Sequence, residues 1–207
     1  MIRRLLRSDA GSTAGEFGMV LPLLIMFLLG TIDVGRFLWT CNRAEKAVQM
    51  GTRYAVATDI IPSGLASYNF ATTGTGAILQ GNPVPTATFG SESCGSSGGT
   101  VTCTCTGTIC ASLASTVNTT AFNNVVARMQ KFYPSLTANN VVITYDNVGL
   151  GYSGDPNGSD VAPLVTVKLT GLTFAPMLFS FFKNTSVGLP AFSSALTMED
   201  GIGNNAE

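Results

Sequence analysis

The chain contains no histidine among its 207 residues, and only 11% of its residues are charged. The absence of histidine excludes Ser-His-Asp and Cys-His nucleophile arrangements and any imidazole metal ligand. The formal net charge is -1, so no basic face is available for nucleic acid. No convergent acids or nucleophile–base pair replace the missing histidine. We therefore expect no enzymatic activity, no metal, no cofactor and no nucleic-acid partner.

Cysteine is scarce and unevenly placed. Cys41 stands alone, whereas a Gly-, Ser- and Thr-rich stretch holds Cys94, Cys103, Cys105 and Cys110. No C-x-x-C spacing occurs, which argues against a zinc knuckle or a thioredoxin-like site. Reactive thiols are the alternative, but no Lys, Arg or His flanks the cluster to favour a thiolate. We expect two local disulfides, formed in an oxidising compartment, with the two cysteines of a predicted strand at 100–106 each pairing outward, to Cys94 and Cys110.

A long apolar run begins directly after a single glutamate. Residues 17–32 carry no charge and, at about 1.5 Å per residue, extend about 24 Å, slightly less than a hydrocarbon core of about 30 Å. Asp33 and Arg36 follow at a helical spacing that allows them to pair. The apolar pattern then resumes to Trp39, which suits the far interface. We predict one membrane-spanning helix over about 17–39, with Asp33 and Arg36 paired or reaching the interface.

Three arginines precede this run, at positions 3, 4 and 7. The positive-inside bias then places the N-terminus in the cytoplasm and the rest of the chain outside. The alternative is a cleaved secretory signal peptide. Against it, Glu16 interrupts the approach to the apolar run, and no A-x-A cleavage site follows.

Several short motifs stand in a characteristic order along the first quarter of the chain. They are Gly11, Glu16-Phe17, Val20-Leu21-Pro22, Asp33-x-Gly35-Arg36 and an alanine-rich stretch that ends in Gly51-Thr-Arg-Tyr-Ala55. In this order and spacing they resemble the TadE-like family, the minor pseudopilins of bacterial tight-adherence (Flp-type, type IVb-related) pilus systems. Gly15 and Gly18 depart from the pattern, because bulkier small residues are commoner there.

The resemblance implies that a prepilin peptidase cleaves between Gly11 and Ser12, so that residues 1–11 form a cytoplasmic leader. Glu16 and Phe17 would then act in subunit assembly, with Glu16 meeting the freed amino terminus of a neighbouring subunit. A carboxylate at the membrane edge favours such a cationic partner. The alternative is that Glu16 is a solvated charge that caps its own helix, where the helix dipole favours an anion. The implied partners are the inner membrane, the peptidase, other pilins and the pilus assembly machinery.

The remaining chain indicates an α+β domain. The first helix is expected to continue to Thr58, giving a TadE-like segment at 12–58, with one apolar stripe formed by Ala44, Ala47, Val48, Gly51, Tyr54 and Ala55. A periplasmic domain at 59–207 follows, with a disulfide-containing loop over about 62–116. We expect a second helix at 115–131, an apolar turn or short helix at 174–182, and strands at 100–106, 140–145, 162–170 and 189–198. The strands at 140–145 and 162–170 should pair antiparallel. The fold class is α+β, pilin-like in outline.

These observations predict a single-pass inner-membrane minor pseudopilin that acts structurally in Flp-type pilus assembly and surface adherence. The alternatives are a membrane-tethered periplasmic binding or adhesion module, with the disulfide loop as its contact surface, and a membrane-anchored periplasmic enzyme. Residues 155–160 look like a calcium loop, but their spacing misses the EF-hand pattern and no glutamate completes it. A polar hairpin loop is the better interpretation there.

Overall fold

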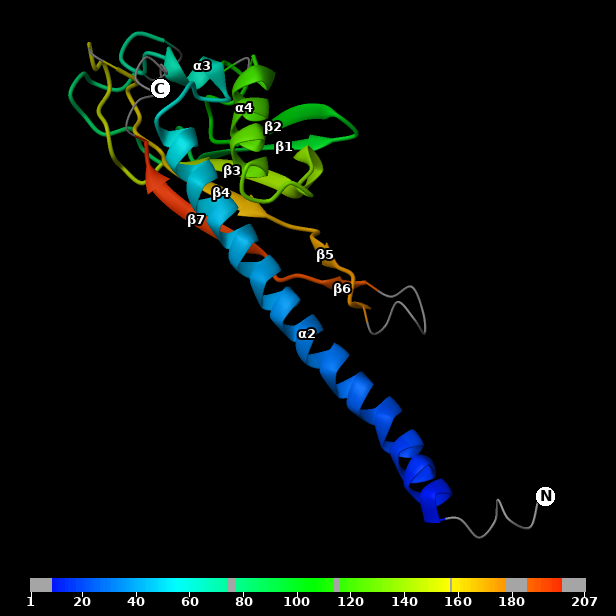
Figure 1. The fold of residues 1–207 in the computed structure, drawn as a ribbon. Helices are drawn as coiled ribbons and strands as arrows, with labels where there is room; N and C mark the ends of the chain where they lie inside the picture. The colour runs from blue at the N-terminus through cyan, green and yellow to red at the C-terminus, as the bar shows by residue number, and fades with distance from the viewer. Residues whose placement is uncertain (1–8, 74–76, 114–115, 157, 178–185, 199–207) are drawn as a thin grey trace. The chain divides into compact units, whose positions relative to one another are not determined.

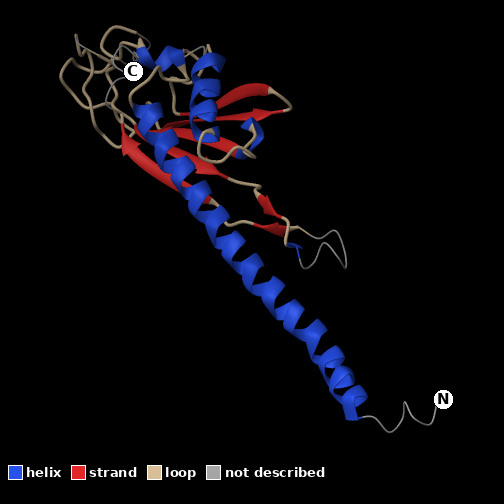
Figure 2. Cartoon of the chain, in the orientation of Figure 1, coloured by secondary structure: helices blue, strands red, loops and turns tan. Residues whose placement is uncertain are grey.

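The computed structural model describes residues 9–73, 77–113, 116–156, 158–177 and 186–198 (Figure 1). Its helices are α2 (Asp9–Val56), α3 (Ser63–Ala66) and α4 (Thr119–Gln130), with a 3-10 turn η1 (Ala138–Asn140). Its strands are β1 (Ser91–Ser97), β2 (Thr100–Thr106), β3 (Val141–Asp146), β4 (Leu164–Leu169), β5 (Thr173–Phe174), β6 (Val187–Gly188) and β7 (Phe192–Thr197). Figure 2 shows the mixture of helices and strands that confirms the α+β class.

The chain divides into two compact units, which are described separately. The helix unit comprises Met1–Cys41 and Thr173–Leu189, and the sheet unit comprises Asn42–Leu172 and Pro190–Glu207. The first part of α2 therefore groups with a segment that lies far away in the sequence.

The sheet unit contains a five-stranded sheet in the order β2-β1-β3-β4-β7. Every neighbouring pair is antiparallel. The predicted pairing of the strands at 140–145 and 162–170 is confirmed, because β3 pairs with β4 from Val141 opposite Leu169 to Asp146 opposite Leu164. Strand β1 lies where the sequence predicts only loop. Its two core-facing side chains are Glu92 and Cys94, so it lacks the apolar alternation by which strands are recognised.

One face of this sheet forms the core with the end of α2 and with α4. The predicted stripe on α2 is confirmed, because Ala44, Ala47, Val48 and Ala55 are buried. Gly51 permits a close approach to α4, since a Cβ added there would lie 2.6 Å from Cγ of Met129. Nearer the start of α2, Arg43 Nε donates a 2.9 Å hydrogen bond to the carbonyl oxygen of Phe132, which lies just beyond the end of α4.

Helix α4 begins at Thr119, a few residues later than the sequence predicts. Its N-cap is Asn118, whose side-chain oxygen accepts a 3.0 Å hydrogen bond from the backbone N–H of Ala121. That side chain satisfies a donor that a helix terminus leaves without an intrahelical partner, so it defines where the helix starts. The apolar face of α4 is buried through Phe122, Val125 and Met129.

The helix unit contains α2 up to Cys41 and a two-stranded sheet of β5 and β6. The helix continues through Pro22 without interruption. Of the predicted apolar turn or short helix at 174–182, Phe174 belongs to strand β5 and Met177 is helical, whereas residues 178–182 lie outside the described part of the chain. The last predicted strand, at 189–198, forms as β7 from Phe192.

Candidate functional site

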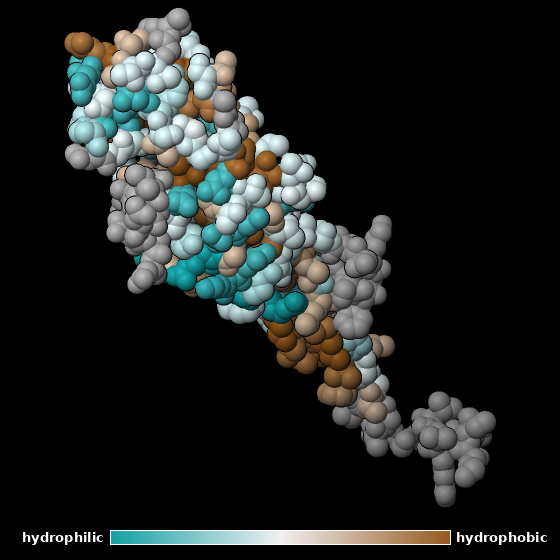
Figure 3. Space-filling model, turned by 90° about the horizontal axis from the view of Figure 1, so that it is seen from above, coloured by the Kyte–Doolittle hydropathy of each residue, from teal (hydrophilic) through white to brown (hydrophobic). Residues whose placement is uncertain are grey.

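The candidate membrane span is the apolar part of α2. Within the described residues, Ala14–Val56 is the helix that is long and apolar enough to cross a membrane. Its large side chains are exposed, and Phe27, for example, is 74% exposed. Figure 3 shows these apolar side chains in brown along the helix. A core helix of a soluble protein would bury such side chains, whereas lipid-facing side chains must be exposed within the protein itself.

The predicted processing and assembly residues lie at the start of α2. Gly11 and Ser12 belong to helical backbone, because α2 begins at Asp9. The side chains of Glu16 and Phe17 are exposed. Their predicted roles concern a peptidase and neighbouring subunits, so they stay predictions.

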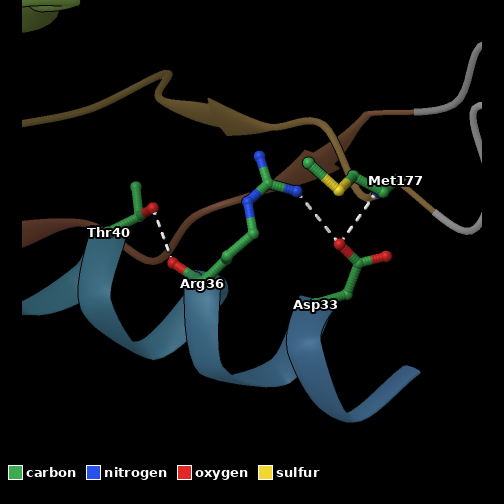
Figure 4. Close-up of polar contacts among 4 residues, drawn as sticks. All are labelled: Asp33, Arg36, Thr40 and Met177. Carbon is green, nitrogen blue, oxygen red and sulfur yellow. Dashed lines mark hydrogen bonds and ion pairs between the residues drawn. The ribbon is translucent and has the colours of Figure 1, made fainter. Parts of the chain in front are cut away.

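Asp33 and Arg36 are brought together on α2. Arg36 Nη1 lies 3.1 Å from Asp33 Oδ1, and the Asp33 residue is only 8% exposed. The same oxygen accepts a 2.9 Å hydrogen bond from the backbone N–H of Met177 (Figure 4). Thr40 Oγ1 donates to the carbonyl oxygen of Arg36 at 2.8 Å. Helical spacing predicts the ion pair, but no local signal in the sequence identifies Met177 as a third member.

An aromatic ring packs against the arginine of this polar pair. The Arg36 guanidinium carbon lies 5.3 Å from the centroid of the Phe174 ring, within the range of a cation–π contact. Phe37 meets the same ring edge to face, with 5.6 Å between centroids. Beside them lies a cavity of about 330 Å³, lined by Gly30, Asp33, Val34, Phe37, Phe174, Pro176 and Val187. A second apolar groove, lined by Met26, Phe27, Gly30, Thr31 and Val34, continues it along α2.

The four clustered cysteines form two disulfides. Cys94 bonds to Cys103, which lies directly opposite it in the β1–β2 pair, and Cys105 bonds to Cys110. The two cysteines of β2 thus each pair outward. Cys41 is a free, half-buried thiol. The first bond staples a hairpin, and the second closes the turn that follows it.

Two buried polar side chains tie together loops of the sheet unit, and sequence reasoning did not identify this role for either. Asp160 accepts a 2.7 Å bond from the N–H of Phe70 and a 3.0 Å bond from that of Asp155. The loop at 155–160 therefore uses its carboxylate for backbone bonds, and the described residues contain no cluster of ligands able to hold a metal. Asn147 Nδ2 donates to the carbonyl oxygens of Val84 and Phe89, both at 2.9 Å.

Within the described residues, fold and site define a protein with a candidate membrane span near its N-terminus and an α+β unit carrying two disulfides. A family model described as TadE-like protein matches residues 11–53 and confirms the resemblance over that segment. No curated protein and no solved structure matches the chain. The residues beyond position 53 are therefore interpreted from their own structure.

Proposed function

We propose that the protein is a TadE-like minor pseudopilin, a membrane-anchored structural component that acts in assembly of a Flp-type pilus and in surface adherence. One observation carries the proposal: the segment that matches the family model, 11–53, is largely the helix whose apolar side chains are exposed. A helix of this kind requires lipid or other apolar helices around it. A subunit that is stored in a membrane and then packed against neighbours meets both surroundings.

In this proposal α2 anchors the chain in the bacterial inner membrane. The arginines at positions 3, 4 and 7 keep the N-terminus in the cytoplasm, and the sheet unit lies in the periplasm. The two disulfides support an oxidising location for the sheet unit. The chain acts as a structural subunit and as the substrate of a peptidase, with no catalytic role of its own.

Cleavage between Gly11 and Ser12 would create an amino terminus close to Glu16. In a bundle of staggered helices, that amine can meet the Glu16 carboxylate of a neighbouring subunit and neutralise it at the membrane edge. The proposed partners are accordingly a prepilin peptidase, other pilins and the assembly machinery.

The test is the mature N-terminus of the membrane-associated protein, read by intact-mass analysis with and without the cognate peptidase. We expect loss of residues 1–11 only when the peptidase is present. Gly11→Val should block cleavage, because a bulky residue replaces glycine at the cut bond. Gly15→Val is the matched control, since a Cβ there meets nothing within 4 Å. An uncut wild-type chain in the presence of active peptidase would contradict the pseudopilin proposal.

A second candidate, a membrane-tethered binding or adhesion module, is favoured by the stapled β1–β2 hairpin. One disulfide, Cys94–Cys103, joins the two strands of this hairpin, a second closes the turn after it, and the threonines of edge strand β2 point away from the core. A rigid, exposed edge is suited to presenting a contact surface. An uncut chain that still supports adherence would favour this candidate.

A further inference from the structure

Asp33 is a buried carboxylate on an otherwise exposed stretch of helix. An ionised group within a span is costly unless partners surround it. One partner, Arg36, is local, but the second is the backbone N–H of Met177, which is 144 positions away in the sequence. The segment around Met177 therefore helps to enclose the Asp33 carboxylate, which the helix alone leaves open on that side.

The depth of this contact follows from the length of the helix. A span that starts at Phe17 needs about 20 residues to cross a hydrocarbon core of about 30 Å, which places its far boundary near Phe37. Asp33 and Arg36 then lie at the outer edge of the hydrocarbon. A hydrogen bond of 2.9 Å holds Met177 at the same depth as Asp33. This step rests on the proposed function, because it takes α2 to be a membrane span.

The residues next to Met177 have the composition of a lipid interface. Met177 is 47% exposed and Val187 is 42% exposed, although both are apolar. Phe174 carries the Arg36 guanidinium against its ring, and arginine and aromatic side chains gather where hydrocarbon meets headgroups. The cavity beside these residues shares Gly30 and Val34 with the apolar groove that reaches Met26 on the span.

The geometry points to a second membrane contact in this protein: residues 173–177 and 186–189 lie in the outer lipid interface, held there by the hydrogen bond from Met177 to Asp33. The partner is the lipid surface itself, at the boundary between headgroups and acyl chains. The contact encloses the Asp33 carboxylate and fixes how deeply α2 is inserted.

The test is depth-resolved fluorescence quenching of the full chain in phosphatidylcholine vesicles. Cys41→Ser removes the free thiol, and a bimane label is then attached to Val187→Cys. The vesicles contain phosphatidylcholine with a nitroxide either near the headgroup or near the end of the acyl chain. Phe27→Cys serves as the control on the span, and Leu79→Cys, which is 76% exposed in the sheet unit, serves as the aqueous control.

We expect the label at 187 to be quenched most by the shallow nitroxide, the label at 27 by the deep one, and the label at 79 by neither. A label at 187 that is unquenched while the label at 27 is quenched would overturn the second contact and leave the span intact. Unquenched labels at both sites would overturn the span and the contact together. The label at 187 could also be shielded from both nitroxides. If this shielding disappears when the protein is diluted with lipid, a second copy of the chain covers the surface, which also overturns the inference.

Substitution of Asp33 tests the hydrogen bond that holds the segment. Asp33→Asn keeps an oxygen that can accept from Met177, whereas Asp33→Leu removes it. We expect Asp33→Leu to raise the ratio of detached to docked segment about tenfold, as for loss of a hydrogen bond to a charged acceptor. The label at 187 should then lose its shallow quenching, and Asp33→Asn should retain most of it. Equal quenching in wild type and Asp33→Leu would overturn the role given to this bond.

Discussion

Glu92 is 1% exposed, and neither of its carboxylate oxygens has a hydrogen-bond partner among the described residues. Strand register places it between Tyr145 on β3 and Cys105 on β2. Burial raises the pKa of Glu92 above its ordinary value of 4.5, because the charged form loses its hydration. Burial also raises the pKa of Tyr145, and the nearby Glu92 carboxylate adds to that effect. Glu92 therefore holds its proton in the folded protein at pH values at which the unfolded chain has begun to lose it.

Glu92 should therefore make stability fall as pH rises. Above about pH 4.5 the unfolded chain releases this proton while the folded chain keeps it, so the free energy of unfolding falls as pH rises and levels off at its lower value once the raised folded pKa is passed. Glu92→Gln removes the titration, and its stability relative to wild type should increase from acid to neutral pH. Urea unfolding of the full chain in detergent, at several pH values, measures the difference. Parallel pH profiles for the two proteins would refute this prediction.

Gly51 is required by the packing of α2 on α4. A Cβ at this position would lie 2.6 Å from Cγ and 2.7 Å from Sδ of the buried Met129. We expect Gly51→Ala to destabilise the sheet unit by about 1–3 kcal/mol through overpacking, despite the better helix propensity of alanine. A double-mutant cycle with Met129→Ala should recover part of that loss, because it makes room for the new methyl group. Additive effects in denaturant unfolding would show that the contact with Met129 is not the cause.

The turn closed by Cys105–Cys110 is also held by backbone bonds. The N–H groups of Thr108 and Ile109 donate to the carbonyl oxygens of Ala87 and Thr88, both at 3.2 Å. Gly107 has a φ of 129°, a conformation that L side chains rarely adopt, which lets the chain reverse beside that loop. The disulfide therefore adds to an existing set of contacts.

Removing that bond should cost a moderate amount of stability. For so short a loop, chain entropy gives about 2 kcal/mol for the double variant Cys105→Ser and Cys110→Ser. Denaturant unfolding measures the loss, and Cys41→Ser is the control that should leave stability unchanged. Non-reducing peptide mapping should find the Cys94–Cys103 bond intact in the double variant. A scrambled bond between the remaining cysteines would show that the two disulfides depend on each other.

The sequence predicts those elements whose burial follows a simple period. The end of α2 and the strands β3 and β4 carry apolar residues at helical or alternating positions, so they are found close to their true bounds. Strand β1 is missed because Glu92 and Cys94 occupy its core positions. Its place in the sheet comes from pairing with β2 and β3, which is a tertiary effect.

The sequence likewise predicts only part of the candidate site. Asp33 and Arg36 are predicted as a pair because they are neighbours on one helix. Phe174 and Met177 complete the cluster from a distant part of the chain, and no spacing rule connects them to α2. Long-range contacts of this kind depend on the folded topology, so only the local half of the cluster is visible in the sequence.

The proposed assembly role depends on the helix unit, which contains Glu16. If Glu16 pairs with the amine of a neighbouring subunit, Glu16→Gln should permit insertion and folding but sharply reduce piliation. Glutamine removes a charge from the membrane edge, so stability in the bilayer should not fall. Glu45→Gln, at an exposed position on the same helix, is the control and should be piliated normally. Normal piliation of Glu16→Gln at matched protein level would favour the helix-capping interpretation.

Strands β4 and β7 are direct neighbours in the sheet, with Leu169 opposite Phe192. Antiparallel neighbours can be connected by a turn of about two to five residues, yet the chain between them is much longer and includes β5 and β6. The chain thus leaves the sheet and returns beside the point of departure. The strand order consequently places no demand on the length or composition of this insertion. Insertions, deletions or replacements between Leu169 and Phe192 are therefore compatible with the same strand pairings.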